Sequence, residues 1–148
     1  MRRLAIVVLA LLGAASACKS NGNGTGPSPA ELTGTWDATK IEFTQVASPF
    51  TKVDVVPTGG SAVLVLVSGG GCTFTITATG GPDGVFTGTW SASSDLLSLD
   101  LAGPFFNTTW EFDMTLSNTT LTLSGADTDF TFASTPEAAK FGLVLTKQ

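Results

Sequence analysis

The residues of this chain that could do chemistry are mostly carboxylates. Its 148 residues include no histidine and no tyrosine, and only two cysteines, Cys18 and Cys72. Without histidine there is no Ser-His or Cys-His pair to activate a nucleophile, and the commonest ligand of catalytic zinc is missing. Cys72 lies on the apolar side of an alternating run, where a thiol is an inert hydrophobic side chain. Any acid–base chemistry would therefore depend on Asp and Glu.

Two carboxylate pairs have a spacing that could do chemistry. Glu111 and Asp113 lie two residues apart on one face of a run, as the two acids of a glycosidase could. Their face alternates with an aromatic one, so we expect both on the solvated exterior. Asp127 and Asp129 in "GADTD" resemble half of a calcium loop, without the later Glu that completes such a loop. We expect no catalytic residue, no metal and no cofactor.

The surroundings of Cys18 predict a lipid anchor. A basic "MRR" precedes an apolar run, Leu4–Leu12, that is too short for a bilayer span of roughly 20 residues. Residues 1–17 therefore predict a secretory signal peptide. The small residues before Cys18 fit an ordinary signal-peptidase site or a bacterial lipobox, whose cysteine is lipidated. Residues 18–31, rich in Gly, Ser, Asn and Pro, predict a flexible tether, which favours lipidation of Cys18.

The charge balance excludes several classes of partner. After residue 17, five lysines and no arginine stand against twelve Asp and Glu. This argues against nucleic acid, which needs clustered Lys and Arg, and against electrostatic docking on anionic lipid. With Cys18 lipidated, Cys72 has no intramolecular partner, so an exported domain would depend on its core without a disulfide. We expect a monomer attached to the membrane covalently.

Alternation of apolar and polar residues predicts antiparallel strands throughout residues 32–148, the expected single domain. The run "CTFTITAT" (Cys72–Thr79) shows the pattern most clearly. Five short stretches of turn residues, "PTGGS", "SGGG", "GGPDG", "LSNT" and "SGAD", separate successive runs. Runs so closely joined predict an all-β fold, an antiparallel up-and-down β-barrel of about 8–10 strands. A sandwich of two sheets is the alternative.

Two places depart from the alternation. Trp36 has one parity and Ile41 and Phe43 the other, so a bulge near Thr39–Lys40 would place all three inside. The stretch "STPEAAK" (134–140) predicts one short helical turn before the last strand, because a Ser or Thr cap precedes a Pro suited to a first turn.

The sequence T-G-T-W occurs twice, at Thr33–Trp36 and Thr87–Trp90. An opening Gly-x-Trp, a meander, a short helical turn and a final strand resemble the lipocalin-like (calycin) proteins, and more closely the bacterial lipocalin-like lipoproteins. The resemblance covers 32–148. Lipocalins usually pair the first-strand Trp with an Arg, and here Lys140 or Lys147 would take its place by a cation–π contact. The resemblance implies a barrel that binds a small apolar molecule.

Lys19, and not Asp, directly follows the cysteine, and in the Gram-negative lipoproteins that this chain resembles this implies sorting to the outer membrane. We therefore expect the bacterial cell envelope, with the protein anchored in the outer membrane and facing the periplasm. An eight-stranded barrel is just wide enough to be filled by side chains or to hold one small ligand, and both alternatives stay open. A filled barrel would indicate a non-catalytic interaction or structural module. The candidate ligand-binding residues are Trp36, Phe74, Phe86, Trp90, Trp110, Phe112 and Met114.

Lipidation of Cys18 is directly testable. We expect intact-mass analysis of the membrane fraction to show a diacylglyceryl or triacyl addition on a chain that begins at Cys18. The matched control is Cys18→Ser, which has no thiol to acylate and should leave the membrane fraction. A soluble, unmodified mature protein with Cys18 present would contradict the anchor.

Overall fold

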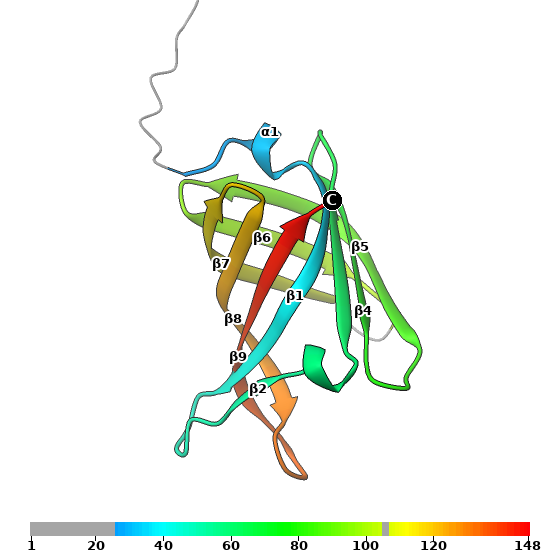
Figure 1. Cartoon of the computed structure of the whole chain (residues 1–148), viewed down its shortest axis with the longest axis vertical. Helices are drawn as coiled ribbons and strands as arrows, with labels where there is room; N and C mark the ends of the chain where they lie inside the picture. Colours follow the sequence, from blue (N-terminus) through cyan, green and yellow to red (C-terminus); the bar gives the residue numbers. More distant parts are fainter. Residues whose placement is uncertain (1–25, 105–106) are drawn as a thin grey trace, which may run out of the picture.

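The computed structural model describes residues 26–104 and 107–148. The predicted signal peptide, Cys18 and most of the predicted tether lie outside the described residues. Within the described residues, nine strands and two short helical turns follow one another (Figure 1). In order, they are α1 (Pro29–Leu32), β1 (Gly34–Gln45), β2 (Lys52–Asp54), the 3-10 turn η1 (Val56–Thr58), β3 (Ser61–Leu66), β4 (Gly71–Thr77), β5 (Asp83–Ser93), β6 (Leu96–Ala102), β7 (Asn107–Ser117), β8 (Thr120–Thr131) and β9 (Pro136–Lys147).

Eight of these strands close into an antiparallel barrel. From β3 to β9 every strand pairs with the next along the chain, and β1 pairs with both β3 and β9. The remaining strand, β2, pairs with β1 as an extra strand. Closure gives each of the eight barrel strands a neighbour on both sides, although β7 and β8 pair only along Asp113–Ser117 and Thr120–Ser124. The predicted all-β, up-and-down barrel is confirmed, and the two-sheet sandwich is excluded.

Strand β1 has two different neighbours on one side. Its first residues, Gly34–Asp37, pair with β3, and Glu42–Thr44 pair with β2. On its other side β1 pairs with β9 along nearly its whole length, with a register shift between Ala38 and Lys40. This shift is the predicted bulge. Trp36 and Ile41 are five positions apart and would point to opposite faces of a regular strand. The extra residue of the bulge lets both side chains point into the barrel, where both are buried.

Two local expectations were wrong. Residues 134–140 hold no helical turn, because Pro136 begins β9 and pairs with Thr131 of β8. The stretch "SGAD" is not a turn between strands, because β8 runs through it with a register shift between Leu123 and Ala126. In both places pairing with a neighbouring strand satisfies the backbone and overrides the local preference.

The end of the predicted tether also differs from the expectation. Pro29–Leu32 form α1, a single helical turn. The backbone N–H and hydroxyl of Ser28 both donate to the Glu31 carboxylate, at 2.8 and 2.6 Å, and these hydrogen bonds lower the Glu31 pKa. This is a capping box, which fixes where a helix begins. The ordered domain therefore starts before residue 32.

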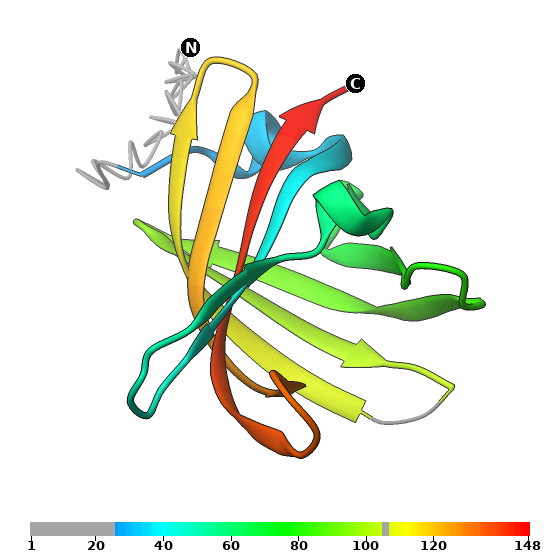
Figure 2. The ribbon, with the colours of Figure 1, turned by 60° about the horizontal axis from the view of Figure 1, so that its bottom comes forward.

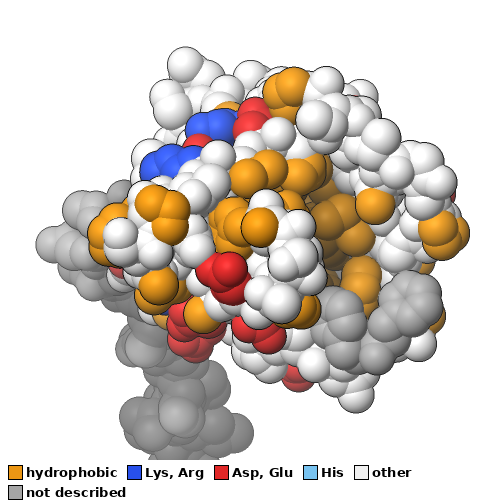
Figure 3. Space-filling view, turned by 90° about the horizontal axis from the view of Figure 1, so that it is seen from below, with side chains coloured by type: hydrophobic (Ala, Val, Ile, Leu, Met, Phe, Trp, Pro, Cys, Tyr) orange, Lys and Arg blue, Asp and Glu red, His pale blue; other side chains and the backbone are white. Residues whose placement is uncertain are grey.

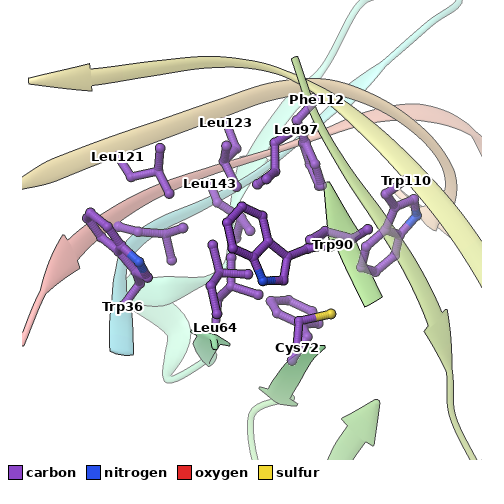
Figure 4. Close-up of a cluster of buried hydrophobic side chains, with 14 of the residues drawn as sticks. Trp36, Leu64, Cys72, Trp90, Leu97, Trp110, Phe112, Leu121, Leu123 and Leu143 are labelled. Carbon is purple, nitrogen blue, oxygen red and sulfur yellow. The ribbon is translucent and has the colours of Figure 1, made fainter. Parts of the chain in front are cut away.

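Side chains fill one half of the barrel. The buried cluster contains all three tryptophans together with leucines from α1, β3, β6, β8 and β9. In the view of Figure 4, Trp90 lies between Trp36 and Trp110, with Leu64, Leu121 and Leu143 around them. Apolar side chains from opposite walls therefore meet here and leave the barrel packed.

The glycine of the second T-G-T-W allows two strands to approach closely. A Cβ at Gly88 would lie 1.8 Å from the backbone oxygen of Asp100 on β6. Backbone cannot give way as a flexible side chain does, so Gly88→Ala should lower the free energy of unfolding by about 1–3 kcal/mol. Gly81→Ala is the matched control, because its Cβ would meet only Ala78, at ordinary contact distances. Urea denaturation of both variants would measure this, and equal midpoints would contradict the argument.

Candidate ligand-binding cavity

The upper end of the barrel is closed by α1. Leu32 is fully buried, and its backbone oxygen accepts a 2.7 Å hydrogen bond from the Trp36 indole Nε1. Lys147 Nζ lies 5.1 Å from the centroid of the Trp36 ring and donates to the Glu31 backbone oxygen at 2.8 Å. Trp36 is 0% exposed under this cover. The expected cation–π contact is therefore made by Lys147, whereas Lys140 forms an ion pair with Asp127.

Trp90 holds a turn at the same end of the sheet. Its indole Nε1 donates to the backbone oxygen of Val67 at 3.0 Å, and its backbone N–H donates to Gly70 at 2.7 Å. Val67 and Gly70 belong to the β3–β4 turn. The tryptophans of both T-G-T-W stretches thus join neighbouring backbone to the core, and each uses its indole N–H to do so.

The opposite end of the barrel is open and hollow. Here the β1–β2 and β8–β9 hairpins extend beyond the other strands (Figure 2). Seen from this end, hydrophobic side chains line a hollow at the centre of the molecule (Figure 3). The cavity has a volume of about 430 Å³. Such a volume lies within the range of small-molecule sites.

One wall of the cavity is aromatic. Phe43 on β1 stacks on Phe130 of β8 at a centroid distance of 4.1 Å and on Phe141 of β9 at 5.0 Å. Phe141 also contacts Trp110 of β7 at 5.0 Å. All four rings border the cavity. They form a continuous row from the mouth to the packed core, where Trp110 meets Phe112. We call Phe43, Trp110, Phe130 and Phe141 the aromatic wall.

The facing wall is aliphatic, with hydroxyl groups near the mouth. Val55, Ile76 and Pro82 border the cavity on this side, and so does Thr79, whose hydroxyl donates to the Thr58 backbone oxygen. Thr128 of β8 adds a further hydroxyl beside the aromatic wall. The cavity therefore offers apolar surface with a few hydroxyl groups.

Asp129 is the one charged residue among the described residues that border the cavity. Along β8, the buried or half-buried Ala126, Thr128 and Phe130 alternate with the exposed Asp127 and Asp129. Alternation in a strand turns these two sets to opposite faces. The Asp129 carboxylate therefore lies on the outer face, and no charged side chain among the described residues points into the cavity.

The seven candidate residues are all buried but do not form one site. Phe86 and Trp110 border the cavity. Trp36 closes the other end, Trp90 holds the β3–β4 turn, and the rest of the set packs into the filled core. Phe43 was expected on the inward side of its strand, but alternation does not say at which height in the barrel a residue lies. Phe43, Phe130 and Phe141 were therefore not predicted as cavity residues.

The remaining chemical groups lie apart from the cavity. Glu111 and Asp113 are exposed on the outer face of β7, as expected from their parity. Burial, with a smaller contribution from Asp100, raises the pKa of the Cys72 thiol, which disfavours the reactive thiolate. Among the described residues, no group of three or more potential metal ligands gathers.

No helix within residues 26–104 and 107–148 is long and apolar enough to cross a membrane.

Comparisons with known proteins found a similar solved structure but no family. No protein-family model matches the chain, and no curated protein matches it. One solved structure, described as a redesigned beta barrel, aligns with a TM-score of 0.49 and 15% sequence identity. The alignment covers 84% of this chain and 98% of the redesigned barrel.

The closure by Lys147 predicts a stability difference between two lysines. Lys147→Met should lose the hydrogen bond to Glu31 and the cation–π contact, together about 1–2 kcal/mol of the free energy of unfolding. Lys140→Met breaks only the exposed ion pair with Asp127 and should cost about 0–1 kcal/mol. Urea denaturation at moderate salt would compare them. An equal loss in both variants would show that Lys147 does not hold the closed end.

Proposed function

We propose that this chain is a lipid-anchored protein of the bacterial envelope whose lipocalin-like barrel binds a small apolar ligand. The observation that carries the proposal is the open cavity of about 430 Å³ beside the aromatic wall. A barrel whose core was filled at both ends would offer no such space. Cavities of this size and apolarity bury most of the surface of a small ligand.

The cavity opens at the end of the barrel opposite the point where the chain enters the domain, which also supports an anchored binding protein. The chain enters the domain through α1 at the upper end of the barrel (Figure 1). The mouth of the cavity lies at the opposite end, which Figure 3 shows from below. With Cys18 lipidated, an anchor attached before α1 would leave the mouth free to exchange ligand. The expected place is the outer membrane, on the periplasmic side.

A second candidate function is a non-catalytic interaction module. It is favoured by the β1–β2 hairpin, where Phe50 is 63% exposed and Val46 is 48% exposed. Exposed apolar side chains at a hairpin tip are suited to contact with another protein. The ligand experiment that follows separates the two functions, because the interaction module needs no cavity occupant.

Native mass spectrometry of protein taken from its own membrane should show a co-purifying small molecule. An added ligand should change the fluorescence of Trp110, which borders the cavity. Thr128→Phe places a ring inside the cavity and should weaken binding of the uncharged dye N-phenyl-1-naphthylamine about tenfold, equivalent to about 1.4 kcal/mol.

Thr122→Phe is the matched control, because Thr122 is exposed on the outer face of the same strand. It should leave the affinity for the dye unchanged. The proposal fails if native mass spectrometry finds no bound molecule and the unaltered protein does not bind the dye. Equal weakening in both variants would place the dye outside the cavity.

A further inference from the structure

We infer that the cavity selects an uncharged ligand, with a hydroxyl or carbonyl as its polar group, over an anionic or cationic molecule of the same size. This inference rests on the proposed function and names the chemical class that the same cavity takes. It follows from where the charged side chains of the barrel lie and from what each of them already contacts.

The lysines of the described residues are all engaged elsewhere. Lys40 and Lys52 both contact the Glu42 carboxylate, with Nζ–O distances of 2.6 and 3.2 Å. Lys140 pairs with Asp127 at 2.6 Å, and Lys147 covers Trp36 at the closed end. A carboxylate or phosphate on a ligand would therefore find no free ammonium group in or beside the cavity.

Two exposed carboxylates lie next to residues that border the cavity. Asp83 is exposed between Pro82 and Gly84, which border the cavity, and the Thr77 hydroxyl donates to its carboxylate at 2.6 Å. Asp129 is exposed on the outer face beside Thr128. These carboxylates repel an anion that approaches the mouth, and salt at physiological concentration screens them beyond about 8 Å. An anionic ligand thus meets repulsion outside and no partner inside.

A cation meets the opposite problem. Asp83 and Asp129 would attract it to the rim, but no carboxylate turns into the cavity to accompany it inward. Burial of an unpaired charge of either sign is strongly unfavourable, whereas a hydroxyl or carbonyl needs only a hydrogen bond. The Thr128 hydroxyl, half-buried in the cavity wall, can supply one.

The test compares three ten-carbon competitors that differ only in the head group: decanol, decanoate and decylamine. Each displaces N-phenyl-1-naphthylamine from the exported whole chain carrying Cys18→Ser, which has no lipid and needs no detergent. At pH 7.5 decanoate is anionic and decylamine cationic. Decanol should displace the dye at a concentration at least about tenfold lower than either charged competitor, because only the charged heads remain unpaired.

A lysine placed in the cavity should change the preference. Thr128→Lys, or Ala78→Lys at the exposed mouth if the first variant does not fold, should bring decanoate to the affinity of decanol or beyond it. Thr122→Lys adds the same charge on the outer face of β8 and should leave the order unchanged. A preference that shifts equally in both β8 variants would show that overall charge, and not the cavity, decides.

The outcomes separate this inference from the proposed function. Failure of the dye itself to bind overturns both. Dye binding with decanoate or decylamine as effective as decanol overturns the uncharged class and leaves ligand binding standing. Dye binding with decanol preferred, and with the preference altered by the cavity lysine alone, supports both.

Discussion

The pairing of β1 with β9 is the interaction on which the rest of the structure depends. This pairing joins the first barrel strand to the last and closes the meander into a barrel. The apolar faces of the strands therefore enclose one common interior. The bulge between Ala38 and Lys40 lets one strand keep both Trp36 and Phe43 on that interior. Beyond Asp37, β1 leaves β3 and takes β2 as its neighbour, and the chain between β2 and β3 contributes Val55 to the cavity.

The two ends of the closed barrel have different packing. At the upper end, indole N–H groups of Trp36 and Trp90 donate to nearby backbone oxygens, so α1 and the β3–β4 turn lie directly on the core. At the lower end the hairpins extend outward, and the rings of the aromatic wall stack on one another along one side. Rings that stack on one another in this way form a stable wall and do not fill the space in front of it.

The charged side chains of the described residues lie on the outside of the barrel and not in its interior. On the outer faces of the strands Lys40 and Lys52 pair with Glu42 and lower its pKa, and Lys140 pairs with Asp127. The interior receives apolar side chains and threonine hydroxyls. A closed barrel with this arrangement keeps an open cavity compatible with solvent outside, because each polar group has a partner or water and each apolar group has a neighbour.

The sequence alone determined which face of most strands is buried, because alternation is a local property and a bulge appears as a change of parity. It thereby predicted the barrel, the inward tryptophans and the exterior position of Glu111 and Asp113. Only the tertiary structure decided the rest. Strand pairing overrode the helical signal at 134–140, and closure brought Phe43 against Phe130 and Phe141 from distant parts of the chain. Height along the barrel depends on register between strands, which no single strand encodes, and that height separates cavity residues from core.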